Sequence, residues 1–285
     1  MTDFEAWGAD RVDDLLGLVR AAPGADDLTV DELLLSCHER GGAVLAASGI
    51  GAVAVAVGRA ADGALLASVR LAVTDGPASA GRLDALLVAA EEWARARSAA
   101  RIVIGGGLPF SLWPGAVAES PLADAALSRG FALRRSWTAW HVPASFRADP
   151  PPGVEVRRAV RDDDVALVLV ESAARWPRRS DEIALALDHG TCHVAIEASG
   201  DVDVLLGVAT HSIARAGWTG PVGVVDVHRR RGIGRALLGQ VCRDLMIAEF
   251  DGVVVADVPD DATRAFLGSV GATPTMSLVT LERDL

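Results

Sequence analysis

Residues 224–238 read VVDVHRRRGIGRALL and join three local patterns in one stretch. A short apolar run comes first, a basic turn with Gly232 and Gly234 follows, and apolar residues then recur at helical spacing from Leu237 to Leu245. Glycines let a backbone approach a ligand closely and adopt angles that are closed to other residues. A helix that begins at such a turn presents unpaired N–H groups and the positive end of its dipole. We therefore expect this strand–turn–helix stretch to bind an anion, and a pyrophosphate fits best.

Two familiar phosphate loops are excluded, because the stretch has neither Gly-x4-Gly-Lys-Ser/Thr nor the three-glycine dinucleotide spacing. It resembles the acyl-CoA loop of the GNAT superfamily of N-acetyltransferases, which reads Arg/Gln-x-x-Gly-x-Gly/Ala between a strand and a helix. The match here is Arg229-x-x-Gly232-x-Gly234. A basic surface turn at the start of an ordinary helix is the alternative. The apolar strand before the turn and the regular helix after it favour the acyl-CoA loop.

Length and composition narrow the class of protein. A chain of 285 residues is long enough for two domains. Its net charge of −11 argues against a nucleic-acid partner. No apolar run is long enough to cross a membrane and the N-terminus is acidic, so we expect no membrane partner and a cytoplasmic location. The three cysteines lack metal-ligand spacing, so we expect buried, reduced thiols and no metal site.

The helix and strand patterns of the two halves repeat one another. The first half is expected to contain two helices, three strands, a helix, a strand, a helix and a strand, which is the order of a GNAT domain. A proline-rich stretch follows, and a similar pattern then restarts. We therefore predict an α/β protein with two GNAT-like domains, each a mixed, mostly antiparallel central sheet flanked by helices. The predicted boundaries are 1–145 for the first domain, 146–153 for the linker and 154–285 for the second domain.

The first copy lacks the loop that would bind acyl-CoA. The corresponding residues 73–80 contain no arginine and no Gly-x-Gly. Pro77 removes one N–H donor, and the Asp75 carboxylate would repel a phosphate. The first domain is therefore interpreted as a degenerate copy without a cofactor.

The resemblance implies that the second domain binds acetyl-CoA or another short acyl-CoA and transfers the acyl group directly to an amine. In this family the strand before the loop diverges from the next strand, and the pantetheine arm pairs with its backbone. The loop amides and arginines hold the pyrophosphate. Carried onto this sequence, the cofactor-binding residues are Val222, Gly223, Val224, Arg229, Arg230, Arg231, Gly232, Ile233, Gly234, Arg235 and Asp260.

The catalytic groups are harder to assign. His211 and Glu197 are the candidate proton acceptors, against the alternative that each is an ordinary strand residue; a histidine has a suitable ordinary pKa. The family's next motif places a tyrosine that protonates the departing thiolate, and Leu267 stands there in a chain without tyrosine. An N-acetyltransferase acting on a small-molecule or peptide amine is the main prediction. The alternative is a catalytically impaired CoA-binding or interaction module, and a homodimer is left open.

Overall fold

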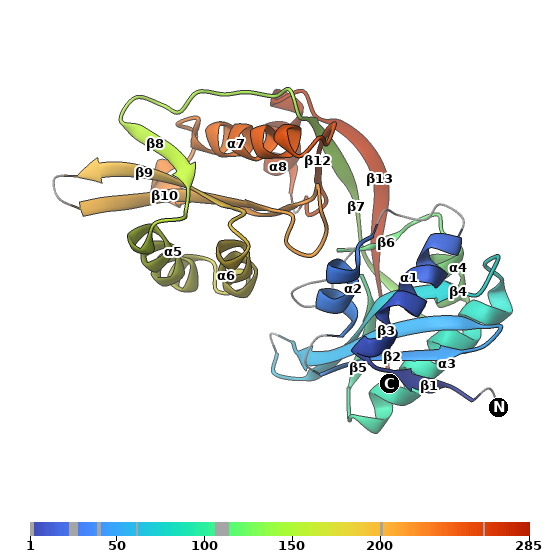
Figure 1. The fold of residues 1–285 in the computed structure, drawn as a ribbon. Helices are drawn as coiled ribbons and strands as arrows, with labels where there is room; N and C mark the ends of the chain where they lie inside the picture. Colours follow the sequence, from blue (N-terminus) through green and yellow to red (C-terminus); the bar gives the residue numbers. More distant parts are fainter. Residues whose placement is uncertain are drawn as a thin grey trace. The chain divides into compact units, whose positions relative to one another are not determined.

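The computed structural model describes residues 3–22, 28–38, 41–60, 62–105, 114–199, 202–258 and 260–285. The chain forms two compact units (Figure 1). The first unit contains Met1–Trp137 together with Met276–Leu285, and the second contains Thr138–Thr275. Both units are built from helices and sheets, so the α/β class predicted from the sequence is confirmed.

The first unit places helices on both faces of one sheet. Its helices are α1 (Val12–Ala21, after the 3-10 turn η1, Ala9–Arg11), α2 (Val30–Cys37), α3 (Ala80–Ala96) and α4 (Pro121–Ser128). Its strands are β1 (Glu5–Trp7), β2 (Gly42–Ala47), β3 (Gly51–Arg59), β4 (Leu65–Thr74), β5 (Arg101–Ile104) and β6 (Ala116–Val117). The sheet order is β1-β2-β3-β4-β5, with β4 and β5 parallel and the other neighbours antiparallel.

Local sequence signals account for these helices. Thr29 and Glu32 form a capping box at the start of α2, and the Ser79 hydroxyl accepts a hydrogen bond from the Arg82 N–H at the start of α3. The apolar stripe of α3, which includes the fully buried Leu86, packs with α4 against one face of the sheet. A second core lies between the other face and helices α1 and α2. The sheet is therefore buried on both sides.

The second unit has the same layering around a smaller sheet. Its strands β8 (Val154–Arg158), β9 (Cys192–Ser199), β10 (Val202–His211) and β11 (Thr219–Val224) form an antiparallel sheet in the order β11-β10-β9-β8. Helix α7 (Ile233–Ile247) covers one face, and α5 (Asp162–Arg175) and α6 (Ser180–Asp188) cover the other (Figure 1). Strand β12 (Gly252–Val255) and helix α8 (Asp261–Ser269) follow α7.

Two long strands, β7 (Ala132–Pro143) and β13 (Thr273–Asp284), each pair with a strand from the other half of the sequence. The end of β13 pairs with β5 in the first unit, with Leu281 opposite Ile104. The end of β7 pairs with β12 in the second unit, with Val142 opposite Val253. The continuous division predicted at residues 146–153 therefore differs from the compact units, each of which takes its last strand from the other half of the sequence.

The proline-rich segment 146–153 lies within the second unit and packs along α7. A side chain on Gly239 would approach the Ala148 backbone nitrogen to 3.0 Å, and the Phe146 ring lies 5.6 Å from the Arg235 guanidinium. The glycine thus allows the segment to lie close to the helix. Among the described residues, no helix combines the length and apolarity needed to cross a bilayer.

Candidate functional site

The basic turn between β11 and α7 has an unusual backbone. Strand β11 ends at Val224, and a 3-10 turn (η2, Asp226–His228) follows it. Arg230 and Gly232 have φ angles of 61° and 87°, in the left-handed region. Such turns direct successive N–H groups into a concave surface that suits an anion. Gly232 also provides no side-chain cap to the first turn of α7. The N–H groups of that turn therefore have no competing side-chain acceptor.

The turn carries arginines that are anchored to different degrees. Arg229 forms an ion pair with Asp226 at 2.6 Å, and Arg231 forms one with Glu197 at 3.1 Å. Arg235 donates to the Ser269 carbonyl oxygen at 3.0 Å. Arg230 is exposed and has no ion pair with any described residue. Within the described part of the chain, the turn thus combines arginines held in place with Arg230, which has no ion pair.

The edge of β11 that faces away from β10 is open. The Val225 N–H donates to the Leu206 carbonyl of β10 at 2.9 Å. Because peptide groups alternate sides along a strand, those of Val222 and Val224 face away from β10. The Val224 carbonyl accepts a hydrogen bond from the Arg229 side chain there, at 3.4 Å. This edge is therefore free to pair with an extended ligand.

Strands β11 and β12 meet at one end and then separate. A parallel bridge joins Trp218 to Val254, where the Val254 N–H donates to the Gly217 carbonyl at 3.0 Å. Beyond this bridge, among the described residues, β11 pairs with β10 and β12 pairs with β7. Among the described residues no further pairing joins the two strands, and we call this unpaired interval between them the opening; it ends at the basic turn.

Solved structures resemble this chain along its whole length, although the sequence matches no protein-family model and no curated protein significantly. A tandem GNAT protein from the clavulanic acid biosynthesis pathway superposes with a TM-score of 0.73 at 18% identity, covering 100% of this chain and 98% of its own. A GCN5-related N-acetyltransferase from Sphaerobacter thermophilus gives 0.67 at 18% identity, covering 99% and 95%. The chain has the tandem GNAT fold.

A third similar structure belongs to a longer protein. It is the GCN5-related glucosamine N-acetyltransferase region of a fungal multidomain GH3 β-N-acetylglucosaminidase, with a TM-score of 0.73 and 16% identity. It covers 99% of this chain, which spans 38% of that protein's length. At identities this low, the superpositions show the shared tandem GNAT fold alone. Activity depends on the residues of the site.

The two copies of the GNAT fold differ at the start of their long helix. In the first copy the Ser79 side chain caps α3, and the Arg82 guanidinium donates to the Pro77 carbonyl at 3.2 Å. The Asp75 carboxylate accepts from the Gly49 N–H at 3.0 Å. The first copy thus begins its helix with an ordinary cap, whereas α7 in the second begins without one.

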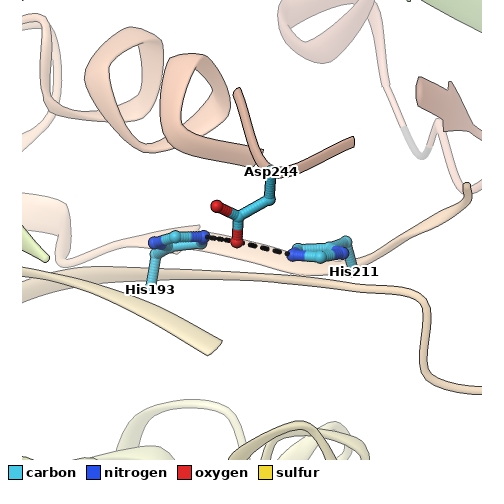
Figure 2. Close-up of side chains that lie close together, drawn as sticks. All are labelled: His193, His211 and Asp244. Atoms are coloured by element: carbon cyan, nitrogen blue, oxygen red, sulfur yellow. Dashed lines mark hydrogen bonds and ion pairs between the residues drawn. The ribbon is translucent and has the colours of Figure 1, made fainter. Parts of the chain in front are cut away.

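His211 lies at the contact between the sheet and helix α7. It is 5% exposed and faces α7, where its Nε2 lies 3.2 Å from the Asp244 Oδ2 (Figure 2). His193 Nε2 lies 2.9 Å from the same oxygen, and Arg158 donates to it as well. Although burial opposes ionisation of Asp244, these hydrogen bonds and charges hold the pKa of its carboxyl well below the usual range. In this structure His211 therefore joins the sheet to α7, and its role as a proton acceptor stays a prediction.

The same three side chains have the composition of a metal site, with ligand atoms within 4.8 Å of one another. Two features fit a metal poorly. The Arg158 guanidinium already contacts Asp244 Oδ2, and His193 Nδ1 is buried with no hydrogen-bond partner among the described residues. A ligating imidazole usually donates its second N–H to an acceptor. The cluster is better explained as an ion-paired structural contact.

Glu197 and Asp260 are also occupied by structural contacts. Glu197, on β9, pairs with Arg231 and so holds a turn arginine, and its role in proton transfer stays a prediction. Asp260 is the N-cap of α8 and accepts from the Thr263 N–H at 2.7 Å. That hydrogen bond lowers the pKa of Asp260, and the charge of Arg229 contributes, so Asp260 lies in the electrostatic field of the turn. Leu267, at the tyrosine position, is buried.

A polar cluster that no sequence pattern indicated lies on the face opposite α7. Arg179 donates to Glu182 at 2.7 Å and to Asp257 at 2.9 Å. Nearby, the Trp176 ring covers Gly223 of β11 so closely that a Cβ there would meet it at 2.8 Å. These residues come from a helix–helix connection, the first turn of α6 and the segment after β12. No local pattern links such positions, and only the fold brings them together.

Proposed function

We propose that the second unit binds an acyl-CoA and transfers its acyl group, an acetyl group in the simplest case, to an amine. The observation that carries this proposal is the position of the uncapped start of α7 beside the opening between β11 and β12. CoA consists of an anionic head group and an extended arm. The start of α7 suits the head group, and the opening suits the arm. The N-acetyltransferases with similar structures support the transferase class.

The residues of the site would have separate roles in binding acyl-CoA and in the transfer step. The N–H groups of Ile233, Gly234 and Arg235, with the arginines of the turn, bind the pyrophosphate. The peptide groups of Val222 and Val224 pair with the pantetheine arm. The thioester supplies the activated acyl group, and N–H groups along the open edge stabilise the negative charge that develops on its oxygen.

A matched pair of glycines tests binding. Gly234 is the second residue of α7, and Gly81 is the second residue of α3. Isothermal titration of acetyl-CoA should give a Kd on the order of micromolar, about −8 kcal/mol. Gly234→Trp fills the space above the turn and should abolish binding, whereas Gly81→Trp should leave it unchanged. Absence of binding to the parent protein would reject the proposal.

A catalytically impaired CoA-binding module is the second candidate, and Leu267 favours it. The side chain is 1% exposed and cannot donate a proton to a departing thiolate. The measurement that separates the candidates is thiol release from acetyl-CoA in the presence of a panel of primary amines. Binding without thiol release above the rate in buffer would favour the binding module.

A further inference from the structure

The connection between α5 and α6 crosses the opening between β11 and β12. Trp176 packs on Gly223, which lies five residues beyond the Trp218 end of the bridge. Arg179 reaches Asp257, which lies three residues beyond the Val254 end. One short connection therefore contacts both β11 and the segment that follows β12. It borders the opening on the face opposite α7.

Two carboxylates contact one guanidinium at this place. Arg179 forms ion pairs with both Glu182 and Asp257. The Arg179 Nε is buried and has no hydrogen-bond partner among the described residues. A buried hydrogen-bond donor without a partner is uncommon in a folded protein. The cluster thus combines a partly buried carboxylate, Glu182, with an unused donor, and both suit a polar ligand.

We propose that Glu182 accepts the proton of the incoming amine, with Arg179 and Asp257 positioning its carboxylate. This inference rests on the proposed acyl transfer. Burial raises the pKa of Glu182 and the charges of Asp257 and Asp181 add to this, against the opposing effect of Arg179. A raised pKa brings a carboxylate closer to the pH at which a base works best. Asp257 and Arg179 do not themselves exchange protons with the substrate.

The step balances without a further reactant. The ammonium group gives one proton to the Glu182 carboxylate and becomes a neutral amine. Its nitrogen forms a C–N bond with the thioester carbonyl carbon, and the C–S bond breaks. The second nitrogen proton passes to the departing sulfur, directly or through water. The products are an amide, free CoA and protonated Glu182, which returns its proton to solvent.

An affinity reagent tests this position without knowledge of the acceptor. In 2-bromoacetyl-CoA the reactive carbon lies next to the carbonyl, so the nearest carboxylate displaces bromide and forms an ester. Burial raises the pKa of Cys192 and Cys242 to about 12, which keeps these competing thiols protonated. Mass spectrometry of proteolytic peptides should locate the label on Glu182, and excess acetyl-CoA should prevent it. Glu182→Gln should lose the label, and the exposed neighbour variant Asp181→Asn should keep it.

The pH dependence separates positioning from a merely structural role. The labelling rate should rise with pH as Glu182 loses its proton. Asp257→Asn removes a negative charge that raises the pKa of Glu182, so the midpoint should move to lower pH. Label on another residue, or no label although bromoacetyl-CoA competes with acetyl-CoA, would overturn the assignment of Glu182 and leave acyl-CoA binding intact. Failure of acetyl-CoA to bind at all would reject the proposed function.

Discussion

Arg230 combines a free charge with a backbone conformation that costs stability. Its φ of 61° is rare for a residue with a side chain, and no described residue pairs with its guanidinium. Strained backbone tends to occur where function requires it. A glycine would adopt this angle without strain, as Gly232 does nearby, so the arginine is retained at a cost. A phosphate ligand would explain that cost.

Replacing Arg230 should therefore separate stability from binding. Arg230→Gly relieves the left-handed strain and should raise the free energy of unfolding by about 1 kcal/mol or less. It also removes a charge-assisted hydrogen bond, so acetyl-CoA binding should weaken by about 1.5–3 kcal/mol, tenfold or more. Urea unfolding and isothermal titration measure the two effects. Arg230→Ala is the control, because it should weaken binding equally without stabilising the fold. Unchanged affinity in both variants would remove Arg230 from the site.

Among the secondary-structure elements, local signals predicted the helices well. The α3 stripe and the Thr29–Glu32 capping box are properties of neighbouring residues, and so is the basic turn before α7. The short strands β1 and β6 were missed because two or three residues carry no periodicity. The apolar residues before the basic turn do not all belong to a strand, because β11 ends at Val224 and the chain continues into η2. The contact of His211 with Asp244 could not be predicted because the two residues lie 33 positions apart in sequence.

Strand β13 is held in the first unit by a buried carboxylate. Glu91 of α3 is 2% exposed and receives Arg283 of β13 at 3.0 Å, with Arg129 at 3.1 Å and Arg95 at 3.2 Å. Glu91→Gln leaves three guanidinium groups around a neutral amide, which should cost about 3–5 kcal/mol. Amide hydrogen exchange should increase along residues 281–284 and 101–104. Glu92→Gln, at the exposed neighbouring position, should leave the exchange unchanged, and equal exchange in both variants would contradict this role.

For the whole molecule, the strand exchange makes each unit depend on both halves of the sequence. Val279 and Leu281, near the end of the chain, are buried in the core of the first unit. Burial of two such side chains contributes roughly 1.5–3 kcal/mol each, a large share of the usual 5–15 kcal/mol of domain stability. Two tandem domains with closed sheets would give the same local patterns. The sequence therefore predicts two domains without revealing which strand completes which sheet.

A divided chain tests this dependence. Residues 1–145 and 146–285, which follow the division predicted from the sequence, should each fail to give a cooperative thermal transition alone, because each lacks the strand supplied by the other. Their co-expression should restore a complex. Residues 1–137 joined to 276–285 by a short Gly-Ser linker should fold better than residues 1–145, although the joined chain lacks residues 138–145. Cooperative unfolding of the 1–145 fragment by itself would show that β13 is dispensable, since the strand would then add stability without completing the core.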